Sequence, residues 1–216
     1  MKNYKLILFD LDGTLTDPFE GIANSIAYAL HKFDIPIADK NELRKFIGPP
    51  LIESFGNFCG FSDEQARLAL SYYREYFREK GMFENSVYDG IEELLEDLPA
   101  CGIRLCVATS KPEPFAEKIL EHFHLAHYFE CIAGSELDGT RAKKNEVIEY
   151  ALQKCNFVDR TKAVMVGDRE HDIVGAAKCA VDSVGVLFGY GSREELQKAG
   201  ATYVAATVAD IKKVII

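Results

Sequence analysis

Two aspartates separated by one residue are the strongest chemical signal in the sequence. Residues 10–14 read DLDGT and directly follow the apolar run Lys5–Phe9. On an extended segment Asp10 and Asp12 point their side chains the same way, and the glycine after them lets the chain turn sharply. Open α/β sheets bind their ligands at the carboxyl ends of strands, and carboxylate oxygens suit a hard divalent cation.

The segment DLDGT has two other interpretations. An Asp-Gly turn would need no chemistry at all. A calcium-binding loop of the helix-loop-helix kind is the other, and it fails because Leu15 stands where that loop requires glycine and Gly21 where it requires glutamate.

A second pair of acids, Asp168 and Asp172, lies in the segment VMVGDREHD at residues 164–172. An apolar run again precedes the acids, which predicts that they follow another strand. Asp172 could instead cap the helix that runs through Ile173. If acids from two strand ends converge, their carboxylates would join a backbone carbonyl and waters in an octahedral site of oxygen ligands. Such a site selects magnesium over zinc or copper.

Two further segments could bind a phosphoryl group. Thr109 and Ser110 follow a third apolar run, where a hydroxyl and adjacent amides could hold a phosphoryl oxygen. Lys143 and Lys144 open a predicted helix and could supply positive charge. Taken singly, the first segment is an ordinary loop and the lysines are ordinary surface residues.

A parallel sheet is predicted to position these segments. Short apolar runs recur with helical patterns between them, and both neighbours of each run are apolar, as in strands buried on both faces. The runs are Lys5–Phe9, Arg104–Ala108, Glu130–Ala133, Ala163–Val166, Ser183–Val186 and Thr202–Val204. Their alternation with helices predicts a doubly wound, Rossmann-like α/β fold.

One stretch, Asp17–Met82, shows three or four helical patterns and no convincing strand. Its first helix is predicted to start with Asp17 and Glu20 as a capping box and with Pro18 at the first helical position. Another is predicted to begin at Ser62, with Gln65 completing a capping box, and to end at Gly81. The stretch therefore reads as a helical insertion after the first strand.

Charge and composition narrow the class of partner. The chain has 216 residues and a formal net charge of -9, which argues against nucleic acid as a partner and requires any phosphate site to be made locally positive. Neither a membrane-spanning stretch nor a signal segment is evident, so a cytoplasmic location is expected. The six cysteines form no Cys-x-x-Cys pair and are expected to be small apolar residues of a reduced core.

The order of these motifs along the whole chain resembles the haloacid dehalogenase superfamily of phosphatases, in particular its phosphoglycolate-phosphatase-like members. The matching pattern is DLDGT, a strand ending in threonine, a lysine before a helix, and GD-x-x-x-D. The resemblance implies a Rossmann-like catalytic core at residues 1–16 and 83–216 and a small helical cap domain at residues 17–82. Many relatives carry Lys-Pro at the third motif, whereas the matching segment here, Arg141–Asn145, has no proline and offers two lysines. Lys144 is preferred over Lys143 because it is nearer the helix.

The resemblance also implies roles for these residues in an Mg²⁺-dependent phosphatase acting on a small phosphorylated metabolite. Asp10 would attack phosphorus and become an aspartyl-phosphate, and Asp12 would act as general acid and then base. Asp10, the Asp12 carbonyl and Asp168 would bind magnesium, with Asp172 in support.

Thr109, Ser110 and Lys144 would stabilise the phosphoryl oxygens. Phosphoglycolate and nucleoside monophosphates both fit as substrates. The sequence leaves the oligomeric state open.

Three alternatives bear on this interpretation. A dehalogenase would need neither Asp12 nor a metal, and Asp12 therefore argues against it. A phosphomutase on sugar phosphates would share all four motifs. A binding module that keeps the fold without catalysis would use the acidic crevice only to hold a ligand.

Overall fold

In the computed structural model, which describes residues 3–216, the chain divides into two compact units. Among the described residues, one unit comprises residues 3–17 and 87–216, and the other comprises residues 18–86. The short strands β2 (Thr16–Asp17) and β3 (Ser86–Val87) lie in the sequence where the chain passes from one unit to the other. No stretch of helix in the described part of the chain has both the length and the apolar character needed to cross a membrane.

The larger unit is built on a six-stranded parallel sheet in the order β5-β4-β1-β6-β7-β8. Its strands are β1 (Leu6–Phe9), β4 (Arg104–Pro112), β5 (Cys131–Ser135), β6 (Ala163–Gly167), β7 (Asp182–Val186) and β8 (Tyr203–Ala205). Every residue of β1 and β6 is buried, as expected for central strands covered on both faces. The predicted α/β fold with a parallel sheet and a helical insertion is confirmed.

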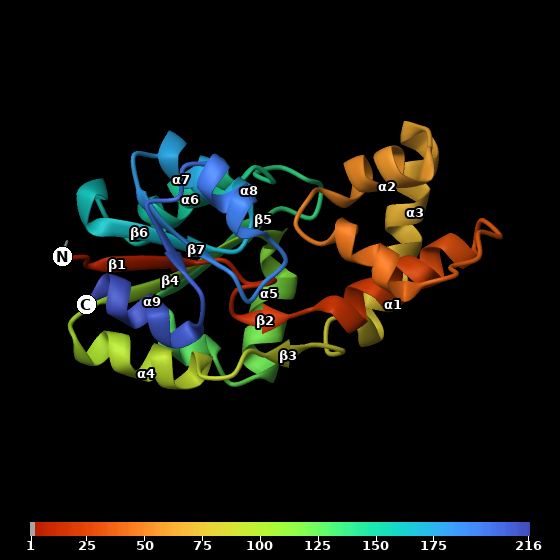
Figure 1. The fold of residues 1–216 in the computed structure, drawn as a ribbon. Helices are drawn as coiled ribbons and strands as arrows, with labels where there is room; N and C mark the ends of the chain where they lie inside the picture. The colour runs from red at the N-terminus through yellow and green to blue at the C-terminus, as the bar shows by residue number, and fades with distance from the viewer. Residues whose placement is uncertain (1–2) are drawn as a thin grey trace. The chain divides into compact units, whose positions relative to one another are not determined.

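Helices cover both faces of this sheet, with α6 and α7 on one face and α4 and α9 on the other (Figure 1). The helices of the unit are α4 (Ile91–Ala100), α5 (Glu113–His122), α6 (Lys144–Lys154), α7 (Glu170–Lys178), α8 (Arg193–Lys198) and α9 (Val208–Ile215). Two 3₁₀ turns, Ala126–Tyr128 and Arg160–Lys162, complete it. The buried face of α6, which includes Val147 and Ile148, packs in one apolar cluster with Leu6 and Leu8 of β1.

The smaller unit is helical. It contains α1 (Phe19–His31), a 3₁₀ segment (Lys40–Phe46), α2 (Leu51–Cys59), α3 (Asp63–Tyr76) and a π-helical turn (Phe77–Gly81) that continues α3. The predicted capping box at the start of α3 is confirmed, because the Ser62 hydroxyl accepts a hydrogen bond from the Gln65 amide and the Gln65 side chain accepts one from the Ser62 amide. The predicted end at Gly81 is also confirmed.

The predicted start of α1 is wrong in detail. Pro18 is the N-cap rather than the first helical residue, and no side chain caps this helix. The Asp17 carboxylate accepts a hydrogen bond from the Tyr190 hydroxyl, and Glu20 forms an ion pair with Lys40. Both acids of the expected capping box are therefore engaged by residues distant in the sequence, which local spacing could not reveal.

Candidate active site

Strand register brings the first two acidic motifs to one edge of the sheet. Phe9 of β1 is paired in register with Val166 of β6, and the Asp10 amide donates a hydrogen bond to the Val166 carbonyl at 2.9 Å. Asp10 and Asp168 thus follow adjacent strands at their carboxyl ends. Oxygens of Asp10, Asp168 and Asp172 all lie within 4.8 Å of one another, so the expected convergence of acids from two strands is present.

Lys144, the first residue of α6, reaches into this group of acids. Its ammonium nitrogen lies 2.8 Å from Oδ1 of Asp10 and 2.8 Å from Oδ1 of Asp172, and it donates to the Ala108 carbonyl at 3.2 Å. Lys144 is buried, whereas Lys143 is exposed. The structure therefore places Lys144, and not Lys143, beside the predicted nucleophile.

Asp172 takes the capping role that was one of the two interpretations of its sequence position, and it also faces the group of acids. Its Oδ2 accepts a hydrogen bond from the Arg169 amide at 3.0 Å and so caps the start of α7. Its Oδ1 faces Lys144 across the site. The capping contact fixes the carboxylate, and its other oxygen forms an ion pair with Lys144.

Asp12 lies beside a different lysine. Lys111 Nζ donates a hydrogen bond to Asp12 Oδ1 at 2.7 Å, and the two residues are 99 positions apart in the sequence. The Asp12 carboxylate is half-buried and the Lys111 side chain is almost fully buried. Sequence reasoning assigned no role to Lys111, although its place directly after Thr109 and Ser110 at a strand end was an available signal.

Thr109 and Ser110 lie on the last part of β4. Thr109 is buried, and its hydroxyl accepts a hydrogen bond from the Lys111 amide at 3.3 Å. The Ser110 carbonyl accepts one from the Ser135 hydroxyl at 2.8 Å, which ties β4 to the end of β5. The contact of Thr109 with Lys111 places it near the Asp12–Lys111 pair, whereas Ser110 contacts Ser135 through its backbone carbonyl.

A glycine-rich segment after β7 supports Asp168, and sequence reasoning missed it. The Tyr190 amide donates to Asp168 Oδ2 at 2.8 Å. On the other side, Gly13 has a φ of 81°, and a Cβ there would lie 2.2 Å from Asp168 Oδ2, so only glycine fits. Tyr190 lies between Gly189 and Gly191 in the loop that follows β7, and that composition was the signal.

Burial and repulsion from neighbouring carboxylates raise the pKa values of Asp12, Asp168 and Asp172. Burial raises the pKa of Asp168 well above its usual range, and the negative charges of Asp172 and Asp10 raise it further. Burial also raises the pKa of Asp172 and of Asp12, although Lys144 opposes the change at Asp172 and Lys111 opposes it at Asp12. For Lys144, burial lowers the pKa but the charges of Asp10 and Asp172 outweigh it, so the pKa is raised and the ammonium stays charged.

These residues fit a magnesium ion. Four carboxylates face two lysines here, which leaves two negative charges in excess when all are ionised. Asp168 Oδ1 is buried and, within residues 3–216, has no hydrogen-bond partner. A divalent cation would match that excess charge and satisfy this oxygen, and clustered carboxylates are the hard oxygen ligands that magnesium prefers.

Comparison with known proteins agrees with this geometry. A family profile described as "Haloacid dehalogenase-like hydrolase" matches residues 7–186. A "5'-nucleotidase" from Pseudomonas aeruginosa is 46% identical over 98% of this chain and 96% of its own length. A "Tyrosine-protein kinase PtkA" from Mycobacterium tuberculosis is 41% identical over 98% of this chain and 72% of its own length.

A solved structure has the same fold throughout. The crystal structure of a predicted phosphatase from Clostridium acetobutylicum superposes with a TM-score of 0.95 at 52% identity and covers 99% of both chains. The similarity therefore extends over the sheet and over the helical insertion.

Proposed function

The chain belongs to the haloacid dehalogenase-like hydrolases, and from that membership we propose that it is an Mg²⁺-dependent phosphatase that acts through an aspartyl-phosphate on Asp10. The observation that carries the proposal is the convergence of Asp10, Asp168 and Asp172 around the ammonium group of Lys144. In this proposal residues 1–16 and 83–216 form the catalytic core and residues 17–82 the cap domain.

Asp10 and Asp12 divide the chemistry between them. Asp10 Oδ attacks phosphorus in line with the leaving oxygen, the bond from phosphorus to that oxygen breaks, and Asp12 donates its proton to the leaving oxygen. Asp12 then removes a proton from water, which attacks the aspartyl-phosphate and releases inorganic phosphate. The raised pKa of Asp12 favours the protonated form that the first step needs.

The other residues bind charge. Lys144 and the hydroxyls of Thr109 and Ser110 would hold the phosphoryl oxygens, and Lys144 also keeps Asp10 oriented through their ion pair. Asp10, the Asp12 carbonyl and Asp168 would hold Mg²⁺, with Asp172 in support. When bound, the metal supplies charge neutralisation for the phosphoryl group.

We propose small phosphomonoesters as the substrates, with nucleoside monophosphates ahead of phosphoglycolate. The support is the 46% identity to the 5'-nucleotidase over nearly the whole of both chains. The site residues themselves recognise only the phosphoryl group, so they do not distinguish the two leaving groups.

Phosphate release tests the proposal. Purified protein with Mg²⁺ is given a set of nucleoside 5'-monophosphates, phosphoglycolate and an aryl phosphate, and inorganic phosphate is measured. We expect release that a chelator stops and Mg²⁺ restores, and that Asp10→Asn abolishes while its circular dichroism spectrum stays unchanged. Retained activity in Asp10→Asn would remove Asp10 as nucleophile, and no release from any ester with any divalent metal would favour the non-catalytic binding module.

Two phosphoryl-transfer alternatives belong in the same experiment. Because the chain is similar to a tyrosine-protein kinase, transfer of phosphate from ATP to a tyrosine-containing protein is measured as well. Isomer formation from sugar phosphates tests a phosphomutase. Transfer to tyrosine or to a second sugar position at a rate above phosphate release would replace the phosphatase proposal.

A further inference from the structure

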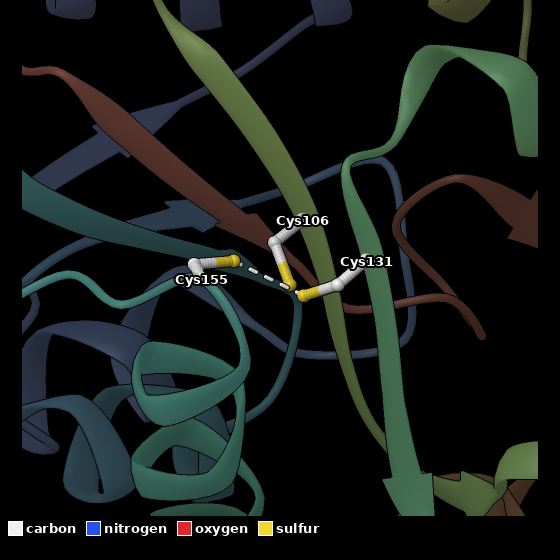
Figure 2. Close-up of side chains that lie close together, drawn as sticks. All are labelled: Cys106, Cys131 and Cys155. Carbon is white, nitrogen blue, oxygen red and sulfur yellow. Dashed lines mark hydrogen bonds between the residues drawn. The ribbon is translucent and has the colours of Figure 1, made fainter.

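Three of the six cysteines converge at one place in the core of the larger unit. Cys106 lies on β4, Cys131 is the first residue of β5, and Cys155 is the C-cap of α6. Figure 2 shows the three side chains pointing toward one another. One sulfur from each residue lies within 4.8 Å of the others. This thiol cluster shares no residue with the candidate active site.

Ordinary apolar packing does not account for the spacing of these sulfurs. Buried cysteines often serve as small apolar residues, and two members of the cluster belong to the core. The Sγ atoms of Cys131 and Cys155, however, lie 3.1 Å apart. Carbon atoms in non-bonded contact prefer about 3.5–4.0 Å, and sulfur is larger than carbon. The separation is that of a hydrogen bond between the two thiols, either of which could donate, so the pair is in polar contact and not only in apolar packing.

The backbone brings the sulfurs together from three different elements. Cys106 and Cys131 are register partners on adjacent parallel strands, so their side chains emerge side by side on one face. Cys155 approaches from the end of α6, which packs on that face. Three sulfurs from fixed secondary structure form a preorganised donor set, and thiolates bind closed-shell thiophilic ions such as Zn²⁺.

The charges around the thiol cluster favour a divalent ion. Arg104 donates to the Cys155 carbonyl at 2.5 Å and Lys154 donates to the Ile132 carbonyl at 2.8 Å, so two cations border the cluster. Each also pairs with a carboxylate, Arg104 with Glu130 and Lys154 with Glu113. Three thiolates bound to a divalent ion carry a net charge of −1, whereas three thiolates bound to a monovalent ion would carry −2. The divalent ion is favoured because a buried net charge is costly.

We propose that Cys106, Cys131 and Cys155 form a binding site for a single divalent thiophilic ion of the Zn²⁺ class. Sulfurs bound to one ion at about 2.3 Å lie about 3.8–4.0 Å apart, so Cys131 and Cys155 must separate by less than about 1 Å. Cys131 is the partly exposed member, and a water on its open side would supply the fourth ligand.

Cadmium is the probe, because only sulfur ligands give its ultraviolet charge-transfer band and the oxygen ligands of the aspartate site do not. The starting protein is the full chain carrying Cys59→Ser and Cys101→Ser, which removes the two more accessible thiols outside the cluster. We expect the reduced protein to bind one equivalent of Cd²⁺ with this band and with a rise in Tm.

Cys131→Ser is the test variant and Cys179→Ser its control, since Cys179 is a buried thiol outside the cluster. We expect Cys131→Ser to weaken Cd²⁺ binding by at least about 10–100-fold. Removing a residue that only hydrogen-bonds to a metal ligand already causes a loss of that size, and Cys131 is itself a proposed ligand. Cys179→Ser should leave it unchanged. Absence of the band in the starting protein, or equal binding by Cys131→Ser, would overturn the proposal.

A measurement on the unaltered protein covers the case in which Cys131→Ser does not fold. Mass spectrometry after alkylation should show that Cd²⁺ protects Cys131 while the exposed Cys101 still reacts. Equal reaction of both would count against the site. A Cys131–Cys155 disulfide in protein alkylated at cell lysis would overturn it in favour of a redox pair.

Discussion

The ammonium group of Lys111 donates a 2.7 Å hydrogen bond to the carboxylate of Asp12, the residue proposed as general acid. Burial raises the pKa of Asp12 and the charge of Lys111 opposes that change. Lys111→Met should raise the pKa of Asp12 further and release its carboxyl from a fixed position. We expect kcat to fall by about 10–100-fold at neutral pH, a part of what a general acid supplies.

The pH profile separates this role from a purely structural one. Because the first step needs protonated Asp12, a higher pKa should move the alkaline limb of the kcat profile of Lys111→Met to higher pH. Lys143→Met is the matched control, since that lysine is exposed and should leave both kcat and the profile unchanged. An unshifted profile in Lys111→Met would show that Lys111 does not act through Asp12.

Magnesium should stabilise the fold. Binding at 100 times Kd contributes about 2.7 kcal/mol, which for a chain of this size raises Tm by about 5–10 °C. Asp168→Asn should remove this stabilisation, because Asp168 offers a buried oxygen without a hydrogen-bond partner in the described chain. Thermal unfolding with and without Mg²⁺ measures the effect, and an equal rise in Asp168→Asn would place the metal elsewhere.

The metal-free form of Asp168→Asn should be more stable than the metal-free parent at neutral pH. Folding raises the pKa of Asp168, so its ionised carboxylate destabilises the folded state at pH values above the unfolded pKa. This destabilisation disappears as the pH falls through the folded pKa toward the unfolded pKa. Asparagine carries no such charge. The difference in free energy of unfolding between the two proteins should therefore shrink on acidification, and a constant difference from neutral to acidic pH would contradict this account.

Gly167 should not tolerate a side chain. A Cβ at this position would lie 2.2 Å from Cγ of Asp172. Gly167→Ala must push Asp172 away from Lys144 or shift β6, at a cost of about 1–3 kcal/mol in unfolding free energy and with a marked loss of kcat. Gly56→Ala in α2 has room and should raise stability by about 0.5–1 kcal/mol. Denaturant unfolding compares them.

Glu195 should stabilise the loop before α7 in a pH-dependent way. Burial raises its pKa, but hydrogen bonds from Arg169 at 2.9 Å and from the Glu170 amide at 2.9 Å outweigh that effect, so its pKa is lowered. Its stabilisation is present above the unfolded pKa of about 4.3 and is lost as the pH falls through the lower folded value. Glu195→Gln should cost about 1–2 kcal/mol at neutral pH and less at acidic pH.

The control for this measurement is Glu194→Gln, an exposed neighbour in the same turn of α8. It should change the free energy of unfolding by far less than Glu195→Gln at neutral pH. If the two variants lose the same stability, the effect belongs to the charge of the turn and not to the contacts of Glu195.

The sequence by itself determined the class of fold and the edge of the sheet where the acids meet. Runs such as Lys5–Phe9 have consecutive apolar residues, which in a strand would face both sides of the sheet, and this pattern favours a strand covered on both faces. Asp10 and Asp168 directly follow such runs. Parallel strands end at a common edge, so their convergence follows from local pattern and topology alone.

Only the tertiary structure decided which side chains touch. Lys144 rather than Lys143 reaches Asp10 because α6 begins at that residue and its packing on the sheet fixes which lysine faces inward. The Asp17 carboxylate accepts from Tyr190 instead of capping α1, and Lys111 reaches Asp12 across 99 positions of sequence.

The thiol cluster was equally invisible before the fold was known, because spacing along the chain carries no information on which elements become neighbours. Cys106 and Cys131 meet through strand register, and Cys155 joins them through the packing of a helix end. Local sequence encodes propensity and burial, whereas contacts between distant side chains depend on register and packing that the whole chain sets together.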